Sequence, residues 1–314
     1  MTNSKTSFSI IIPNYNGAQF LESCLDSLTK SLSLSKSIYE IIIIDNASKD
    51  DSLLKIKELN HSLKILNFKL KINQVNMGFA PAVNQGIKLA KYDYVVLCNN
   101  DLTVAKNYFS LLIDAINSYP NYTTYVGTVL DKEGTHFESQ GLKFYYSGKC
   151  DNILNKQPII KSLINKKPYE IWGASAALVT YKKDIITKIG MFDENFFAYE
   201  EDVDLAFRLH KFGYKTLLIP RALCYHLGGG TSGKMGNFRH KMDFKNWIFL
   251  IIKNYSTKEK MLNLFPIIEQ RLRNFSGLIK NTPKGQKLSS ISWVFQELKK
   301  NVPKMLKYSH DYRN

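Results

Sequence analysis

Hydrophobic runs alternate with amphipathic stretches over the first hundred residues. Consecutive apolar residues predict strands at 8–12, 40–45, 63–68 and 94–98. Apolar residues at helical spacing predict the intervening helices, at 17–32, about 53–59 and 80–90. We expect Ser48 or Asp50 to cap the second of these helices. Strands that alternate with helices predict an α/β fold with a Rossmann-like, mostly parallel sheet flanked by helices.

The rest of the chain has weaker periodicity until its last eighty residues. Short strand-like runs occur at 122–130, 142–146 and 216–219, and the polar, lysine-rich stretch 148–167 is expected to be a mobile loop. From about residue 235 the pattern becomes helical. One apolar stripe comprises Phe244, Trp247, Ile248, Ile251 and Tyr255, and another comprises Ile291, Val294, Phe295, Leu298 and Val302. We therefore predict an α/β domain over 1–235 and a basic helical region over 236–314, with Pro303 breaking or kinking the last helix.

Size and cysteine usage narrow the class of protein. A chain of 314 residues, 44% of them hydrophobic, can bury one large core plus an appendage. The four cysteines are far apart and show no Cys-x-x-Cys spacing, which indicates neither a zinc site nor a disulfide framework and favours the cytoplasm. Every apolar run is too short for a signal peptide or a membrane span. We expect a soluble or peripherally attached protein.

The formal net charge of +16 indicates an anionic binding partner. A nucleic acid, an anionic lipid surface and a diphosphate-bearing substrate all attract such a chain. The lysines lack the clustered aromatic residues of a nucleic-acid readout surface, so we expect no nucleic acid. The amphipathic stretch 288–308 permits two interpretations: a helix packed on the α/β domain, or a helix lying on an anionic membrane.

Polar residues follow the predicted strands where ligands bind in parallel sheets. Asn14, Asp45 and Asp101 all fall at carboxyl ends of strands. The turn from Pro13 to Gly17 could face a nucleobase, although it is neither a dinucleotide fingerprint nor a phosphate loop. Asp45 and Asn46 could accept a hydrogen bond from a base or ribose, or begin an Asx turn.

Two further segments could contact phosphate. Gly78, preceded by Asn76, enters a helix and permits close approach to a phosphate, while Asn84 and Gly86 lie within that helix. A helix start of no functional consequence is the alternative. His226, beside a glycine run, could bind a metal or a phosphate, or serve a structural role.

Two acidic groups are candidates for the chemistry. Asn99, Asn100 and Asp101 offer the hard oxygen donors that suit Mg²⁺ or Mn²⁺, or form an ordinary turn. Glu201 and Asp202 open a predicted helix, where they could remove a proton or simply cap the helix. Asp204 and Arg208 have i,i+4 spacing, which is typical of a surface ion pair.

Taken together, the order and spacing of these segments resemble glycosyltransferase family 2, the inverting enzymes with the GT-A fold. The matching segments are 8–17, 41–48, 76–80 with Asn84 and Gly86, 97–101, 172–174, 192–205, and His226 with 229–232. The resemblance covers about residues 7–235 and is strongest to the rhamnosyltransferase-like branch. It implies a GT-A catalytic domain over 1–235.

The resemblance also implies roles for individual residues. Asp45 would contact the uracil or thymine side of the nucleotide, Asp101 would bind the metal and Asp202 would be the general base. We accordingly predict catalysis by Asp202 and Glu201 and a Mg²⁺ or Mn²⁺ site at Asp101 and His226. Nucleotide contacts are predicted for Pro13, Asn14, Tyr15, Asp45, Asn76, Gly78, Asn84 and Asn100. Asn99 stands where the family often has a carboxylate, which leaves strict metal dependence open.

The predicted reaction moves one sugar from a UDP- or dTDP-sugar, such as dTDP-rhamnose, to a hydroxyl group with inversion. We expect the acceptor to be a glycan or a polyprenyl-diphosphate-linked sugar, in cell-surface polysaccharide biosynthesis at the inner face of the cell membrane. A catalytically inactive scaffold that binds sugar nucleotides is one alternative. A sugar nucleotidyltransferase is another, but residues 13–17 lack its glycine-rich signature with Arg and Lys.

Overall fold

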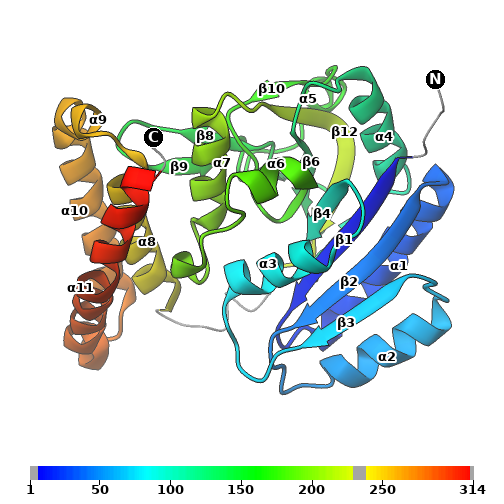
Figure 1. Ribbon diagram of the computed structural model, residues 1–314, viewed down its shortest axis with the longest axis horizontal. Helices are drawn as coiled ribbons and strands as arrows, with labels where there is room; N and C mark the ends of the chain where they lie inside the picture. Colours follow the sequence, from blue (N-terminus) through cyan, green and yellow to red (C-terminus); the bar gives the residue numbers. More distant parts are fainter. Residues whose placement is uncertain (1–5, 229–237, 312–314) are drawn as a thin grey trace.

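A computed structural model describes residues 6–228 and 238–311 and shows an α/β sheet domain beside a group of C-terminal helices (Figure 1). The strands are β1 (Ser7–Asn14), β2 (Ile38–Asp45), β3 (Phe68–Ile72), β4 (Tyr94–Cys98), β5 (Leu102–Val104), β6 (Thr124–Asp131), β7 (Phe137–Ser139), β8 (Leu142–Phe144), β9 (Cys150–Asn152), β10 (Tyr169–Ile171), β11 (Leu178–Lys182) and β12 (Thr216–His226). The α-helices are α1 (Ala18–Ser35), α2 (Ser52–Ser62), α3 (Phe79–Leu89), α4 (Tyr108–Ser118), α5 (Lys161–Ile164), α6 (Lys183–Lys188), α7 (Glu201–Lys211), α8 (Phe238–Asn254), α9 (Thr257–Leu262), α10 (Leu264–Asn281) and α11 (Lys287–Asp311). Short 3₁₀ turns are η1 (Glu194–Phe196) and η3 (Lys284–Gln286).

The main sheet has the order β10-β12-β6-β11-β4-β1-β2-β3. Strands β4, β1, β2 and β3 run parallel to one another, as the alternation of strands and helices predicts. Strand β11 is antiparallel to both β4 and β6, and β12 runs parallel to β6. The second half of the chain therefore extends the parallel half into a mixed sheet.

The buried faces of the central strands explain their uninterrupted isoleucine runs. Side chains alternate across a strand, so Ile10 and Ile43 pack with α1, α2 and α4 on one face of the sheet. Ile11 and Ile42 pack with α3, α6 and α7 on the opposite face. Helices thus cover both faces, and the open carboxyl edge of β1, β2 and β4 is left as the place for a ligand.

Some predicted element bounds are wrong. The third strand is Phe68–Ile72 rather than 63–68, because this edge strand alternates apolar and lysine residues and lacks a long apolar run. The stretch 148–167 contains β9, paired with β8, and the helix α5, and so is not wholly a loop. The N-cap residue of α2 is Asp51, but Asp50 accepts hydrogen bonds from the backbone of Ser52, at the start of α2, and of Ala18, at the start of α1.

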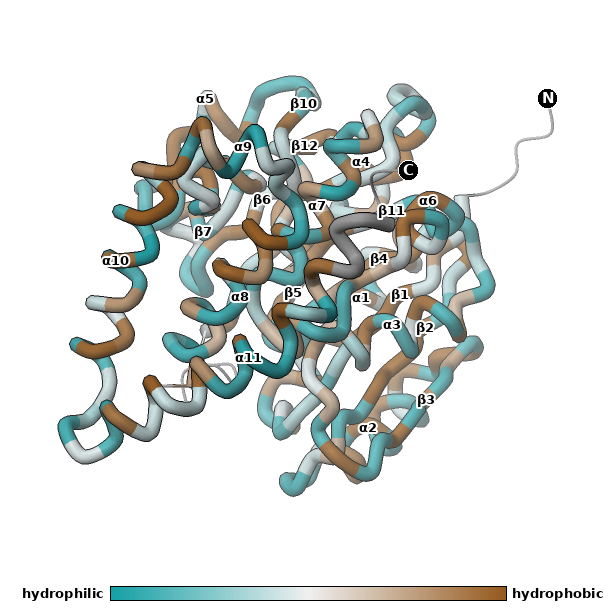
Figure 2. Tube along the Cα trace, turned by 60° about the vertical axis from the view of Figure 1, so that its left-hand side comes forward, coloured by the Kyte–Doolittle hydropathy of each residue, from teal (hydrophilic) through white to brown (hydrophobic). Residues whose placement is uncertain are grey.

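The C-terminal helices pack on the α/β domain through α8. Trp247 and Leu250 of α8 join Val203 of α7 in one buried cluster, and Phe249 packs against Phe196. Helix α11 continues through Pro303, contrary to prediction. Figure 2 shows brown and teal segments alternating along α10 and α11, as expected of amphipathic helices. No helix within 6–228 or 238–311 is long and apolar enough to cross a membrane.

The apolar stripe of α11 faces the protein. Val294 and Met305 are fully buried, and Leu298 and Val302 pack against the clusters that α8 anchors. Phe295, at 60% exposure, is the member of the predicted stripe that faces outward most. The packed-helix interpretation of this stretch is therefore correct.

Candidate active site

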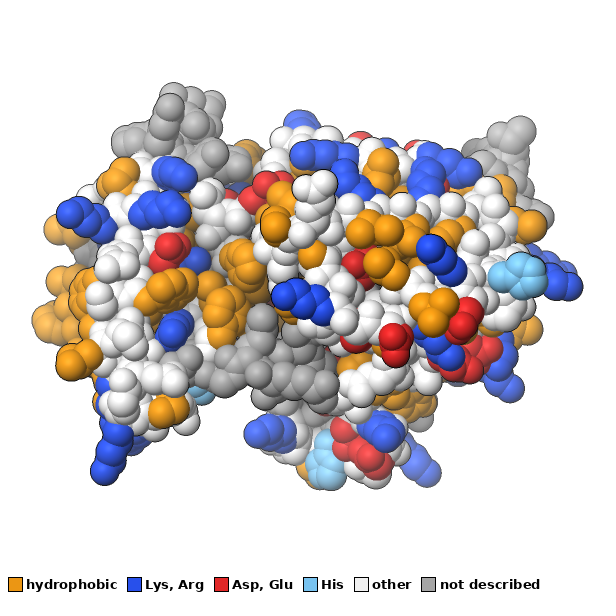
Figure 3. Space-filling model, turned by 90° about the horizontal axis from the view of Figure 1, so that it is seen from below, with side chains coloured by type: hydrophobic (Ala, Val, Ile, Leu, Met, Phe, Trp, Pro, Cys, Tyr) orange, Lys and Arg blue, Asp and Glu red, His pale blue; other side chains and the backbone are white. Residues whose placement is uncertain are grey.

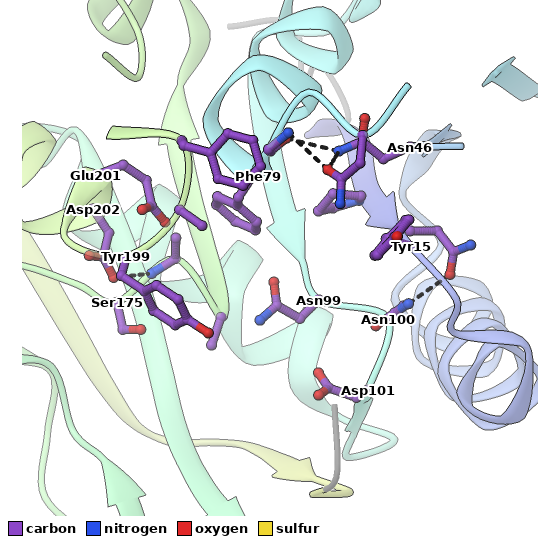
Figure 4. Close-up of a pocket in the computed structure, with 18 of the residues that line it drawn as sticks. Tyr15, Asn46, Phe79, Asn99, Asn100, Asp101, Ser175, Tyr199, Glu201 and Asp202 are labelled. Atoms are coloured by element: carbon purple, nitrogen blue, oxygen red, sulfur yellow. Dashed lines mark hydrogen bonds between the residues drawn. The ribbon is translucent and has the colours of Figure 1, made fainter. Parts of the chain in front are cut away.

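A cavity of about 320 Å³ lies at the carboxyl edge of β1, β2 and β4. Figure 4 shows Tyr15 and Asn46 on one side of it and Glu201 and Asp202 on the other, with Asn99 between them. The predicted residues in its lining are Pro13, Asn14, Tyr15, Asn76, Gly78, Asn100, Asp101, Glu201, Asp202 and His226. Residues separated by nearly 200 positions therefore meet at one site. The predicted segment 229–232 and the predicted boundary at 235 lie outside the described residues.

The end of the cavity near β1 is built by side-chain amides. Asn14 donates to Asp45 Oδ1 at 2.9 Å and accepts from Asn100 Nδ2 at 2.7 Å. Asn46, which follows Asp45 at the end of β2, donates to Asn76 Oδ1 at 2.9 Å and to the carbonyl of Gly78 at 3.0 Å. These bonds tie the ends of β1, β2 and β4 to the start of α3.

Two predicted nucleotide contacts lie outside the lining. Asp45 is fully buried, and its carboxylate accepts from Asn14 and from both the backbone and hydroxyl of Ser48. Asp45 therefore supports Asn14 from behind the wall, and its direct contact with a base stays a prediction. Asn84 is also buried, and its amide is engaged by Phe192 and Glu194. The helix turns this side chain toward Phe192 and Glu194, and a contact between Asn84 and the nucleotide stays a prediction.

Asp101 and His226 meet across the cavity floor. His226 lies between two carboxylates, with Nε2 3.1 Å from Asp101 Oδ2 and Nδ1 2.6 Å from Glu138 Oε2. These hydrogen bonds raise the pKa of His226 to about 10. Sequence reasoning missed Glu138, which precedes no recognisable motif and reaches the site only because β7 pairs with β6.

The same residues fit a divalent cation. The second oxygen of Asp101, Oδ1, is buried and has no hydrogen-bond partner among the described residues. A carboxylate oxygen and an imidazole nitrogen are ordinary ligands of Mn²⁺ or Mg²⁺. The described part of the chain holds no group of three or more His, Cys, Asp or Glu side chains arranged as a complete metal site. Oxygen atoms from elsewhere would have to complete the coordination.

The two carboxyls at the start of α7 differ in their hydrogen bonds. Asp202 accepts from the backbone of Ala176 at 3.1 Å and of Val203 at 2.8 Å, and also from the Ser175 side chain. Glu201 is buried, and its Oε2 has no partner among the described residues. Burial raises the pKa of both groups, and the charge of Asp202 further raises that of Glu201. Since Asp202 accepts more hydrogen bonds than Glu201, which accepts one from its own backbone, Asp202 is the member that ionises first.

Sequence reasoning also missed the wall of the cavity between η1 and α7. Phe197, Ala198 and Tyr199 line it; they lie within the matching segment 192–205, but no role was predicted for them. Phe197 and Tyr199 have positive φ angles of 66° and 68°, which non-glycine residues rarely adopt. Trp172 lies away from this wall: it stacks on Phe144 and packs against the cluster between α7 and α8.

The predicted surface pair Asp204–Arg208 is buried, so the surface prediction is wrong. Asp204 is 0% and Arg208 2% exposed, and Arg208 Nε donates to Asp204 Oδ2 at 2.9 Å. Lys253 and Asn254 of α8 also donate to Asp204, each at 2.9 Å. Lys253 bonds Asp193 as well, at 2.7 Å. The spacing of the pair is correct, but α8 covers it.

The fold resembles solved transferases of GT-A type. A structure of GalNAc-T7 with UDP, GalNAc and Mn²⁺ matches with a TM-score of 0.63 and 17% identity, over 93% of this chain and 57% of that chain. A structure of S. aureus TarS, residues 1–349, matches with a TM-score of 0.59 and 14% identity, over 98% of this chain and 88% of that chain. At these identities the matches establish the fold, and the predicted GT-A type α/β fold is confirmed.

Sequence comparison identifies more specific relatives. A poly-beta-1,6-N-acetyl-D-glucosamine synthase of Staphylococcus epidermidis is 25% identical over 292 residues, which is 91% of this chain and 62% of that protein. The synthase of the same name from Staphylococcus aureus strain COL is 27% identical over 224 residues, 70% of this chain and 49% of that protein. The chain thus spans half to three fifths of the length of these relatives. Residues 9–190 match the family model for glycosyl transferase family 2, more than half of the chain. The chain belongs to glycosyl transferase family 2.

Proposed function

We propose that the protein is an inverting glycosyltransferase that moves one sugar from a nucleoside-diphosphate donor to a hydroxyl group of a glycan or lipid-linked acceptor. The observation that carries this proposal is the meeting, in one cavity, of three groups from distant segments. These are the amide cluster at Asn14 and Asn46, the Asp101–His226 pair, and the Asp202 carboxylate. Residues 1–228 supply all three, which supports the proposed catalytic domain over 1–235.

The donor would lie along the cavity from the β1–β2 end toward α7. The base and ribose face Asn14, Tyr15 and Asn46, and the diphosphate lies near Asp101. Several of the structures with a similar fold contain UDP or UDP-GlcNAc, which supports a UDP-sugar. The resemblance to the rhamnosyltransferase-like branch supports dTDP-rhamnose instead, so the test below includes both donors.

Asp202 is the proposed general base. The acceptor oxygen attacks the anomeric carbon, its proton passes to a carboxylate oxygen of Asp202, and the bond from that carbon to the diphosphate breaks. Attack on the face opposite the leaving group inverts the configuration. Burial raises the pKa of Asp202 and so makes it a stronger base than an exposed aspartate. Burial and the charge of Asp202 raise the pKa of Glu201 beside it, which favours the protonated form of Glu201.

Asp101 and His226 would bind a Mn²⁺ or Mg²⁺ ion, with donor phosphate oxygens completing the shell. Such a cation offsets negative charge on a departing diphosphate. His226 would give up the proton that Asp101 and Glu138 now stabilise, because a metal ligand must be neutral. Asn99 leaves the protein with fewer charged ligands than a site with two carboxylates, so we propose weak metal binding.

The test is a panel of nucleotide sugars, including UDP-GlcNAc and dTDP-rhamnose, with and without Mn²⁺. One donor should raise the melting temperature most and release its nucleoside diphosphate in the presence of the protein. Asp202→Asn should lower that release by about 10²-fold or more with donor binding kept. Asp51→Asn, an exposed residue beside α2, is the matched control and should change nothing. Stabilisation by a donor without any turnover would support the inactive scaffold instead.

A lipid-linked acceptor would require the protein to contact a membrane through one of its faces. The exposed apolar side chains of α9 and α10 are Met261, Leu262, Leu264, Phe265, Ile268 and Leu272. On α10, positions 265, 268 and 272 lie on one face. Figure 3 shows hydrophobic side chains along the edge of the molecule formed by the C-terminal helices, with Lys and Arg side chains nearby. Residues 238–306 hold 14 lysines and arginines against four acidic residues. We propose that this face, rather than the stripe of α11, lies on an anionic membrane that carries the acceptor.

Sedimentation with liposomes tests the membrane proposal. Binding should require anionic lipid, weaken with salt, and fall at least about fivefold in Phe265→Ser. Phe295→Ser removes a second exposed phenylalanine, 60% exposed on α11 against 83% for Phe265, and should bind as the wild type does. A concentration-dependent dimer that Phe265→Ser abolishes, without liposome binding, would show that a second copy of the chain covers this face.

A further inference from the structure

Helix α8 of the C-terminal region reaches the wall of the proposed active site through one buried side chain. Asn246 is fully buried, and its Nδ2 donates to the carbonyls of Phe196, Ala198 and Tyr199, at 3.1, 2.8 and 2.7 Å. An amide nitrogen has two hydrogens, so the three carbonyls share them. Its Oδ1 has no partner among the described residues. Every hydrogen bond given for this side chain therefore goes to the segment 196–200, which we call the wall segment.

The wall segment has a backbone that needs external support. Phe197, Tyr199 and Glu200 have φ angles of 66°, 68° and 66°, and none of them is glycine. Such conformations persist where the surroundings hold them in place. Asn246 binds carbonyls on both sides of Phe197 and the carbonyl of Tyr199, the residue before Glu200. The amide thus holds the backbone at the positions that deviate from ordinary geometry.

The wall segment also joins the two ends of the cavity. The carbonyl of Phe197 accepts from the backbone of Phe79 at 2.6 Å, at the first turn of α3. Two residues beyond Tyr199, the chain enters α7, whose first turn carries Asp202. Figure 4 shows Tyr199 beside Asp202 and Phe79 farther along the same wall. A shift of the wall segment would therefore move the carboxylate that faces the acceptor.

We propose that Asn246 is a positioning residue for the transfer reaction: it fixes the wall segment and so fixes where α7 presents Asp202. This inference rests on the proposed function. The nucleotide end of the cavity has its own support: Asn100 donates to Asn14, and Asn46 donates to Asn76 and to the carbonyl of Gly78. Loss of Asn246 should consequently impair turnover much more than donor binding.

Three variants separate positioning from stability. Asn246→Leu keeps the volume and removes the donors; Asn246→Gln keeps an amide donor on a longer side chain. Asn301→Leu is the matched control, because Asn301 is a buried amide of α11 whose Nδ2 bonds only Glu297 of its own helix. All three are assayed, below their melting temperatures, for release of nucleoside diphosphate from the best donor of the panel.

For Asn246→Leu we expect kcat to fall about 10- to 100-fold, the loss associated with misplaced catalytic groups, while KM for the donor changes less than about threefold. Asn246→Gln should recover part of kcat, and Asn301→Leu should match the wild type. A kcat for Asn246→Leu within about twofold of the wild type, or an equal kcat loss in Asn301→Leu, would overturn the proposal.

Hydrogen exchange on the wild type gives a readout that needs neither activity nor a stable variant. The Ala198 amide donates to the Phe196 carbonyl within the wall segment. If α8 holds this segment, the Ala198 amide should exchange about as slowly as amides in the middle of α8. Exchange as fast as in the exposed turn at residues 132–133 would overturn the proposal. If no donor is turned over by the wild type, the proposed function fails, and exchange still decides whether Asn246 holds the wall.

Discussion

Lys253→Met removes the cation that links α8 to α7 and tests how strongly the C-terminal helices support the site. Lys253 is 1% exposed and bonds both Asp193 and Asp204, at 2.7 and 2.9 Å. Removing one partner of a buried ion pair costs about 3–5 kcal/mol. Asp204 keeps Arg208 and Asn254 as partners, so we expect the lower end, about 3 kcal/mol. For a chain of this length, that loss lowers the Tm by about 5 °C.

Differential scanning calorimetry measures the shift, with Lys30→Met as the control. Lys30 pairs with Asp26 at i,i+4 spacing, but their side chains are 63% and 40% exposed. Exposed pairs of this kind contribute about 0.5 kcal/mol or less, so the control should shift the Tm by under about 1 °C. Equal shifts in the two variants would refute the assignment of a stabilising ion cluster between α7 and α8.

The pH dependence of the Tm difference between the wild type and Lys253→Met tests the same ion cluster in a second way. Burial raises the pKa of Asp204, but the charges of Arg208 and Lys253 outweigh burial and lower it to about 2. The unfolded value is about 3.9. A lowered folded-state pKa stabilises the protein above the unfolded value, and this contribution is lost as the pH falls toward 2. The Tm gap between wild type and Lys253→Met should stay constant from pH 7 to about 5 and narrow below about pH 4. A gap that widens in acid would contradict this sign.

Three other perturbations follow from the site. Gly78→Ala, at φ 94°, would place a Cβ 2.6 Å from the Phe197 ring, so donor binding measured by calorimetry should weaken at least about tenfold. The control Gly213→Ala, at φ 76° with no atom near the added Cβ, should lower the free energy of unfolding by only about 1 kcal/mol and leave donor binding unchanged. Because burial raises the pKa of Asp202, the acid limb of kcat should lie above the ordinary aspartate range near pH 4, and a limb below pH 4 would argue for another base. Asp45→Asn replaces one acceptor oxygen with an NH2 group that faces other hydrogen-bond donors, so nucleotide affinity should fall about tenfold. Unchanged affinity would show that Asp45, behind the amide cluster, does not contribute to nucleotide binding.

The nucleotide end of the site was accessible from sequence because local signals define it. A run of apolar residues ends at Pro13 and another at Asp45, and parallel strands place such ends at one edge of the sheet. Asn14 and Asp45 are in fact register partners in the β1–β2 pair. Pattern reasoning could not place Asn84, which is buried outside the cavity lining, because helical periodicity does not say which face of a helix turns toward a ligand.

The acceptor end was only partly accessible, because residues far along the chain shape it. The positions of Glu201 and Asp202 could be predicted from the helix start and the resemblance. The positive φ angles at Phe197 and Tyr199 have no signature in these side chains, since they depend on hydrogen bonds from a residue 47 or more positions later. The i,i+4 spacing of Asp204 likewise suggests a surface pair until Lys253 is known to cover it.

The two ends of the cavity are therefore supported in different ways, with a consequence for the roles of the C-terminal helices. Short-range amide bonds between neighbouring strand ends hold the nucleotide end. The acceptor end depends on α8, through Asn246 at the wall segment and Lys253 at Asp204. The exposed apolar face of α9 and α10 follows directly in the chain after α8. If that face lies on a membrane, α8, which positions Asp202, is joined directly to α9 and α10, which would bring the protein to its acceptor. Donor recognition should then be insensitive to changes in α8, whereas transfer to a membrane-bound acceptor should depend on both α8 and α10.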